Sequence, residues 1–353
     1  MQKVFDKEKT KIVKGLAIIL LLIYHLFENA ELVQSLQVDY RPFPLEGFLT
    51  FTGFGNICVS VFVFLTAYGI SAGLLQDKLI TVGDAYRQAA RRFWKLVVQF
   101  FILYLSVNLL WCGLFDYDGL YGMHKQGILY MLSDATGFSQ FFGTPTMNMT
   151  WWYMKVAYIL IFLVPAMAFI VRKTGYSLLL MAFILPFAVS MDTDVERYFF
   201  VAAFGVCAAY GKWPDRMFGW KLHPLFKWLL GFAVLVLSVL VRQNYVVYQT
   251  YVAYVDAPIA LAIVYIACEV LGSIPLLAKV LGFIGSHSMN IYLVHTFFYM
   301  SLWRQFIYSF RHAGLIFAAL LVTTLLYSVV LEFAKKAAVK LWGIVYRKLF
   351  RNC

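Results

Sequence analysis

The chain has 353 residues, of which 62% are hydrophobic and 14% are charged, and its formal net charge is +12. A soluble domain carries about 25% charged residues, so this composition excludes an ordinary water-soluble fold and favours a protein that lies in a lipid bilayer. The basic residues fall between apolar runs and form no recognition motif, so no nucleic-acid partner is expected.

Apolar runs that are long enough to cross a bilayer, about 20 residues each, recur along the chain. No small-residue cleavage site follows the first run, so it is interpreted as a span and not as a signal peptide. The runs predict an all-α, polytopic integral membrane protein with about ten transmembrane helices. The predicted spans lie near 12–30, 51–75, 95–113, 150–171, 176–191, 198–211, 226–241, 252–272, 283–302 and 313–333.

Lysine and arginine are unevenly distributed between the connections of these spans. With the N-terminus in the cytoplasm, 23 of the 30 basic residues fall in cytoplasmic segments, as the positive-inside rule requires. The sequence therefore predicts a multi-pass protein of the cytoplasmic (inner) membrane with both termini cytoplasmic, and the long connection from about Leu114 to Met149 lies outside. No linker interrupts the pattern, so residues 1–353 are expected to form one membrane domain without a fused soluble domain.

The first span combines a basic residue near its cytoplasmic end with a histidine deep in the apolar run. Lys14 and His25 are eleven residues apart, which places both within about 20° of one face of an α-helix. Glu28 follows His25 by three residues, so it is a neighbour on the helix surface that can orient the imidazole. Ionisable groups within spans are costly and often functional. His25 is thus either a general base or a hydrogen-bonded bridge between helices.

Two further groups of polar residues have a functional and a structural interpretation. Arg91, Arg92 and Lys95 precede the third span, where they either dock the phosphates of a nucleotide-bearing donor or form an ordinary positive-inside connection. Ser288, Tyr292 and His295 follow one another at i, i+4 and i+7 on one helix face, which suits either a site or interhelical hydrogen bonding.

The five cysteines are scattered along the chain. They form neither a disulfide framework nor a zinc-binding spacing, so no metal cofactor is expected.

Taken in chain order, these landmarks resemble the acyltransferase family 3 membrane proteins, which O-acylate cell-surface glycans and other acceptors. The resemblance rests on Lys14 to His25, on Gly55 to Tyr68, on Arg91-Arg92-Phe-Trp-Lys95, and on Trp152-Tyr153 together with Ser288, Tyr292 and His295. The chain departs from the family pattern in two places: the family usually has arginine at the position of Lys14, and Ser-Gly where this chain has Thr66-Ala67.

The resemblance implies a membrane-bound O-acyltransferase, with cytoplasmic acyl-CoA, expected to be acetyl-CoA, as donor. Its acceptor would be a hydroxyl of a cell-surface or lipid-linked glycan. It implies His25 as the catalytic histidine and Lys14, Arg92 and Lys95 as neighbours of the donor. Direct transfer and a relay through an acyl-histidine both fit the sequence. The alternative function is a secondary transporter or an exporter of a lipid-linked sugar, since many spans with polar groups near the midplane are also typical of a transport pathway.

Overall fold

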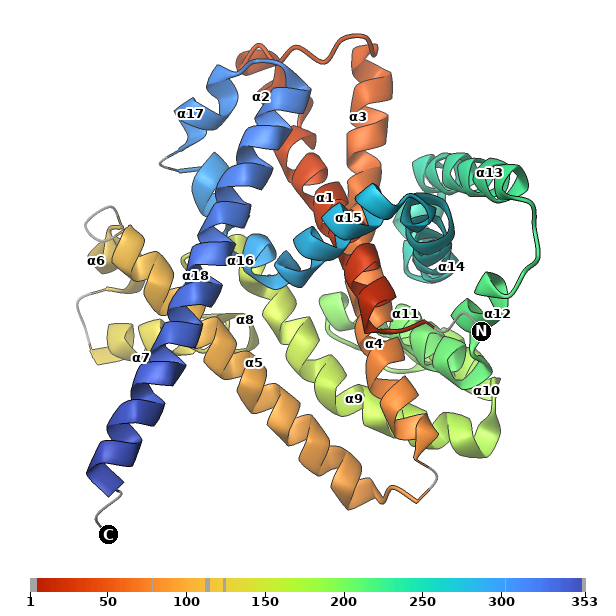
Figure 1. Cartoon of the computed structure of the whole chain (residues 1–353), viewed down its shortest axis with the longest axis horizontal. Helices are drawn as coiled ribbons and strands as arrows, with labels where there is room; N and C mark the ends of the chain where they lie inside the picture. The colour runs from red at the N-terminus through yellow and green to blue at the C-terminus, as the bar shows by residue number, and fades with distance from the viewer. Residues whose placement is uncertain are drawn as a thin grey trace.

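The computed structural model describes residues 5–77, 79–111, 115–122, 125–244, 246–301 and 303–350, with side chains as far as residue 337 (Figure 1). Every regular element in these ranges is a helix, apart from one isolated β-bridge between Asp39 and His312. The predicted all-α class is therefore confirmed. Lys78, Leu114 and the side chains of the C-terminal tail, which contribute to the predicted topology, lie outside this description.

Among the residues that the structure describes, seven helical stretches are long and apolar enough to cross a membrane, which confirms a polytopic membrane protein. They are α1 (Lys7–Phe27), Leu45–Gln76, α5 (Val82–Leu110), Met149–Thr174, α13 (Pro224–Gln243), Val247–Ser273 and Ala313–Ala337. Two shorter apolar helices, α10 (Ser177–Ala188) and α15 (Pro275–Ser286), accompany them. The sixth predicted span forms α11 (Thr193–Gly211), whose first turns carry charged residues.

Some of these stretches are composite. Their parts are α3 (Leu45–Phe54), η1 (Gly55–Ile57), α4 (Cys58–Gln76), η2 (Met149–Trp152), α9 (Tyr153–Thr174), η3 (Val247–Tyr251), α14 (Val252–Tyr265), η4 (Ile266–Val270), η5 (Leu271–Ser273) and α18 (Ala313–Phe350). The remaining helices are α2 (Ala30–Ser35), α6 (Tyr117–Tyr121), α7 (Lys125–Ala135), α8 (Ser139–Phe142), α12 (Trp213–Phe218), α16 (Ser288–Tyr299) and α17 (Arg304–Ser309).

Two predicted spans differ from the helices that form. Helix α5 begins at Val82, well before residue 95, because the Thr81 hydroxyl accepts the backbone N–H of Asp84 and caps its first turn. The basic cluster therefore lies on a helix and not in a loop. The predicted span 283–302 is divided at His287 into α15 and α16, so that α15 packs across α1 while α16 packs against α18.

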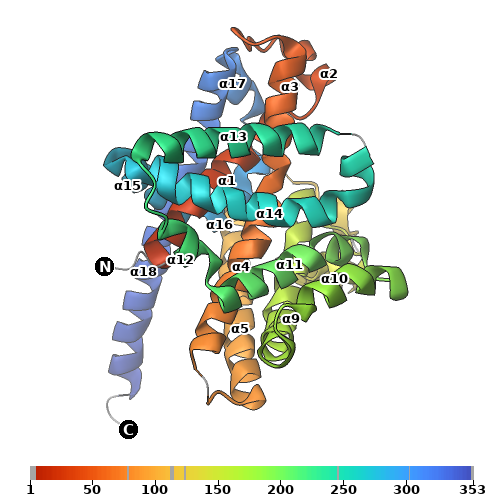
Figure 2. The ribbon, with the colours of Figure 1, turned by 90° about the vertical axis from the view of Figure 1, so that its right-hand side faces the viewer.

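Helix α1 lies in the middle of the bundle, and α15 crosses it (Figures 1 and 2). Two glycines meet at this crossing. A Cβ atom on Gly285 would lie 1.8 Å from the carbonyl oxygen of Lys11, and one on Gly15 would lie 2.0 Å from that of Leu281. Glycine at both positions lets the two backbones approach closely, as in other membrane helix pairs. This crossing fixes the end of α1 that carries Lys14.

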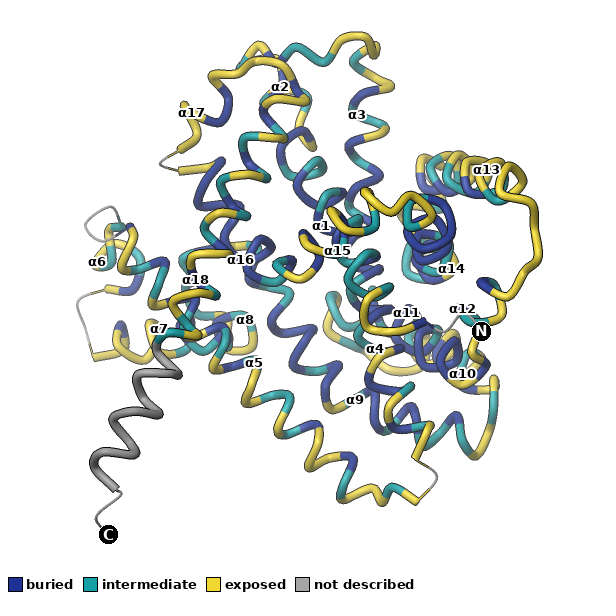
Figure 3. Tube along the Cα trace, viewed as in Figure 1, coloured by how far each residue is buried: buried dark blue, intermediate teal, exposed yellow. Residues whose placement is uncertain are grey.

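Figure 3 shows exposed stretches along α5 and α13, and many of the exposed residues on these outer helices are apolar. On α13 these include Phe226, Leu229, Phe232, Leu237 and Leu240. A soluble monomer rarely exposes contiguous apolar surface of this extent, whereas a lipid-facing helix requires it.

Candidate active site

A basic cavity of about 720 Å³ opens between α1, α4, α5, α9 and the junction of α15 with α16. Five basic side chains line it, and none of the described lining residues is acidic. They are Lys7, Lys11, Lys14, Arg92 and Lys95. Lys14 on α1 thus shares one cavity with Arg92 and Lys95 on α5, although these residues lie far apart in the sequence. Such a cavity attracts a polyanion.

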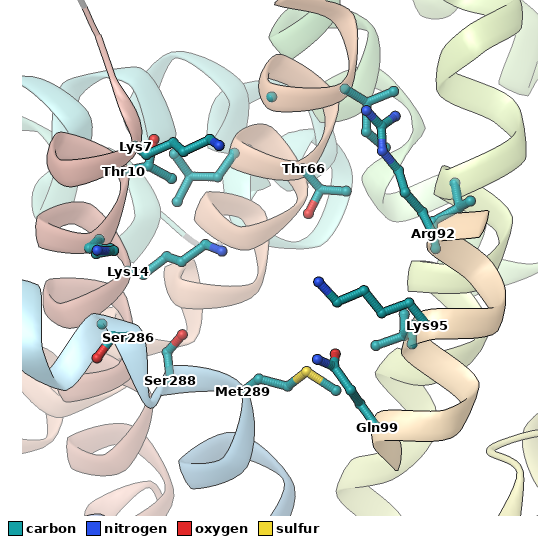
Figure 4. Close-up of a pocket in the computed structure, with 17 residues that line it drawn as sticks. Lys7, Thr10, Lys14, Thr66, Arg92, Lys95, Gln99, Ser286, Ser288 and Met289 are labelled. Atoms are coloured by element: carbon teal, nitrogen blue, oxygen red, sulfur yellow. The ribbon is translucent and has the colours of Figure 1, made fainter. Parts of the chain in front are cut away.

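The cations approach from opposite walls of this cavity. In Figure 4 the amino groups of Lys14 and Lys95 point into the space between α1 and α5. The Nη1 atom of Arg92 is buried and has no hydrogen-bond partner among the described residues. A buried donor without a partner is costly, and phosphate oxygens satisfy such donors well. The basic cavity is therefore suited to a phosphorylated ligand.

An inner cavity of about 240 Å³ continues from the basic cavity into the bundle. Lys14, Thr66 and Ser288 line both cavities, so the two are contiguous. The inner cavity is mainly apolar and ends at Tyr153 and Tyr292, whose ring centroids lie 5.6 Å apart. Its shape and lining suit an uncharged extension of the ligand that the cations hold.

His25 and His295 form a pair of imidazole rings beyond the end of the inner cavity. Their centroids lie 4.9 Å apart, and the His295 ring lies 6.1 Å from that of Tyr292. The Nδ1–H of His295 donates to the carbonyl oxygen of Tyr292 at 2.7 Å, whereas its Nε2 is buried without a described partner. The His295 side chain is fully buried, while 21% of the His25 side chain is exposed. His25 is thus the more exposed member of the pair, and neither histidine lines the basic or the inner cavity.

Glu28 lies beside His25 but does not bind it tightly. Its Oε2 is 3.9 Å from Nδ1 of His25, which is longer than a hydrogen bond. The predicted proximity of the two residues is therefore present, and the orienting hydrogen bond is not formed in this structure.

The connection that leads from α7 to α9 holds α16 by hydrogen bonds. The Trp151 indole N–H donates to the carbonyl oxygen of Leu293 at 2.8 Å, and the Tyr292 hydroxyl donates to that of Thr150 at 2.6 Å. The side-chain amide of Asn148 donates to the Thr296 hydroxyl at 2.5 Å. These bonds surround the turn that carries His295, so the connection holds this residue in place.

Asp134 of α7 organises the same connection. Its carboxylate accepts the Tyr121 hydroxyl and the Met147 N–H, both at 2.7 Å, and the Ser139 hydroxyl at 3.1 Å. Burial raises the pKa of Asp134, and the hydrogen bonds oppose that shift. Because Met147 directly precedes Asn148, this network positions the residues that contact α16.

The remaining predicted residues lie elsewhere. Arg91 is exposed and lines a separate cavity on the other side of α5 with Asp84 and Arg87, so it does not join the basic cavity. Trp152 stacks on Tyr198, with centroids 6.0 Å apart, and lines neither of the two contiguous cavities.

The sequence interpretation missed several residues of the site. Lys7 and Lys11 precede the first apolar run and gave no signal beyond their charge. Asn148 fell in the predicted connection before the fourth span, and Trp151 at the start of that span was not singled out. The pair of Arg242 and Asp256, with Nε to Oδ1 at 2.8 Å, is buried between α13 and α14 and also binds Ser60 of α4. An aspartate inside an apolar run was the signal that could have revealed this pair.

No group of three or more potential metal ligands occurs in the part of the chain that the structure describes.

The comparisons with known proteins agree with this geometry. A family model described as Acyltransferase domain, Acyl_transf_3, matches residues 11–333. No curated protein and no solved structure matches the chain. The match covers α1 with Lys14 and His25, the basic residues of α5 and the whole of α16. Because it spans nearly the entire chain, the protein belongs to this membrane acyltransferase family.

Proposed function

We propose that the protein transfers an acetyl group from cytoplasmic acetyl-CoA to a hydroxyl of a cell-surface or lipid-linked glycan, and that it does so in the cytoplasmic membrane. One observation carries the proposal: the basic cavity continues into the apolar inner cavity, and Tyr292 in the wall of the inner cavity contacts His295, the ring partner of His25. Phosphates of the donor would bind Lys14, Arg92 and Lys95. The arm that carries the thioester would occupy the inner cavity.

In this mechanism His25 is the general base. It accepts the proton of the acceptor hydroxyl while the hydroxyl oxygen bonds to the acyl carbon, and the bond from that carbon to sulfur breaks. The proton then passes to the thiolate, which leaves as the CoA thiol. The His295 ring supports the His25 ring, and Tyr292 in turn contacts His295. Glu28 lies next to His25 on α1, three residues further along the helix. Positioned proton transfer contributes about 10²–10⁴-fold to rate.

The role of the basic cavity is tested by a matched pair of variants on α5. Arg92→Gln together with Lys95→Gln should weaken acetyl-CoA binding about a hundredfold or more, because each charge-assisted contact is worth about 1.5–3 kcal/mol. Arg91→Gln removes one positive charge from the same helix at a residue outside the basic cavity and should leave the affinity nearly unchanged. Titration calorimetry on the purified chain measures both. An equal loss of acetyl-CoA affinity in the Arg91 variant would mean that the net charge of α5, and not the basic cavity, determines donor binding.

The orientation is tested with two exposed lysines. With Cys112 and Cys353 replaced by serine, Lys125→Cys should react with a membrane-impermeant maleimide in intact cells, whereas Lys173→Cys should react only after permeabilisation. The expectation follows from the concentration of basic residues on the cytoplasmic side. Labelling of residue 173 in intact cells would show that the chain has the opposite orientation, with the basic cavity on the outer side of the membrane.

The function itself is tested by mass spectrometry of surface glycans. Cells that lack the protein should lose an acetyl ester that returns when the wild-type chain is supplied. Return of that ester with the His25→Gln chain would show that the proposed chemistry is wrong.

A further inference from the structure

Another cavity, of about 520 Å³ and separate from those described above, lies between the turn after α2 and helix α17. Two arginines line it, Arg304 at the start of α17 and Arg311 after its end. Both are exposed, and neither takes part in any described ion pair. Arg41, on the neighbouring segment, differs because its guanidinium binds the Asp39 carboxylate through two hydrogen bonds. The cavity therefore holds two guanidinium groups whose charge no described carboxylate neutralises.

The backbone around this cavity is held in place. The N–H of Asp39 donates to the carbonyl oxygen of Arg311 at 2.8 Å, and the N–H of Ala313 donates to that of Asp39 at 2.9 Å. Gln37 and Arg311 have φ angles of 50° and 56°, a left-handed conformation that is uncommon for residues other than glycine. Both residues line the cavity. Such conformations cluster at functional sites, where surrounding contacts impose them.

The cavity adjoins the segment that carries His25. Tyr308 forms part of its wall, is buried, and donates its hydroxyl to the carbonyl oxygen of Leu26 at 3.1 Å. Leu26 directly follows His25. Tyr308 thus links the wall of this cavity to the turn of α1 that carries His25.

We propose that this cavity binds an oxyanion, a carboxylate or a phosphate, of the sugar that receives the acyl group. The inference rests on the proposed function and adds a substrate class to it: an anionic hydroxyl acceptor. Arginine binds carboxylates and phosphates through two parallel N–H bonds, which fixes the orientation of the ligand as well as its position. The basic cavity adjoins α1 at Lys14, whereas this cavity adjoins α1 near Leu26, so donor and acceptor would approach the base from different directions.

The test uses the full chain in neutral phosphatidylcholine nanodiscs and three sugars with closely similar hydroxyls: glucose, glucuronate and glucose 6-phosphate. Arg304→Gln and Arg311→Gln should each raise the KM for an anionic sugar about tenfold, with the KM for glucose and the affinity for acetyl-CoA unchanged. Arg41→Gln is the matched control, because it removes an arginine that is already paired, and it should have no effect. Equal changes for glucose, or none for the anionic sugars, would overturn the proposal.

Two further arms separate this proposal from its alternatives. Nanodiscs that contain phosphatidylglycerol test a lipid headgroup as the ligand. The acceptor proposal is wrong if the variants acylate all three sugars with the wild-type KM and differ from the wild type only in their response to this lipid.

Saturation-transfer NMR with glucuronate tests binding without turnover. If the wild type acylates no sugar, the proposed function fails. A glucuronate signal that disappears when Arg304→Gln and Arg311→Gln are combined would still support the oxyanion site. The same signal in both proteins overturns it.

Discussion

Replacing His25 with glutamine is expected to lower the rate of acyl transfer by about 10²-fold or more, at normal abundance and with normal donor affinity. Glutamine retains hydrogen bonding but cannot accept a proton near neutral pH. The His25 ring is partly exposed, whereas His295 is fully buried, so His25 is the better candidate for the base. The measurement is single-turnover transfer from acetyl-CoA by the purified chain, alongside calorimetric donor binding.

Two histidine variants provide the controls. His223→Gln changes an exposed ring at the N-cap of α13 and should keep wild-type activity. His295→Gln loses the ring that supports His25 and should lower activity less than His25→Gln does. If His25→Gln kept near-normal transfer while His295→Gln abolished it, the base would be His295, and His25 would be the structural bridge that its spacing also permits.

The second large effect is expected on stability. Gly285→Ala should destabilise the folded chain by about 1–3 kcal/mol or more, because the added methyl group would lie 1.8 Å from the carbonyl oxygen of Lys11 and backbone must move to admit it. Gly15→Ala should behave similarly, with the carbonyl of Leu281 as the obstacle. Thermal unfolding in detergent, followed by size-exclusion chromatography, measures the loss.

Gly282 offers a control on the same helix. A Cβ atom there meets only a side-chain atom of Ile12, at 4.0 Å, so Gly282→Ala has no obstacle. Alanine is favoured over glycine inside a helix by about 1 kcal/mol, so this variant should be neutral or slightly stabilising. The two alanine substitutions are thus expected to differ in sign. A loss of stability in neither would mean that the crossing of α1 and α15 is not as tight as described, and an equal loss in both would mean that the loss does not come from the contact of Gly285 with Lys11.

Much of the fold follows from local pattern. Length and hydropathy are one-dimensional properties, so the long spans such as α1 and α9 could be predicted directly. The bounds of α5 could not, because its first turns are amphipathic and charged, and helix formation there depends on the Thr81 cap. The break at His287 depends on how α15 packs across α1, a tertiary contact that hydropathy does not contain.

The candidate site, too, could be predicted from the sequence only in part. The eleven-residue spacing of Lys14 and His25 predicts that they share one face of a helix, and the charge of Arg92 and Lys95 predicts that they suit an anion. Spacing cannot predict that residues of α1 and α5 share a cavity, or that Arg91 faces elsewhere. The contact between His25 and His295 joins residues that are 270 positions apart, and only the fold brings them together.

The most direct test of the central claim is the release of CoA thiol by the purified chain in oriented proteoliposomes, with acetyl-CoA supplied to one face at a time. We expect release when the donor reaches the face that bears Lys173, faster when a hydroxyl acceptor is present on the other side, and none from the opposite face. Vesicles that move a sugar across the membrane but never release CoA from acetyl-CoA would contradict the account and favour an exporter.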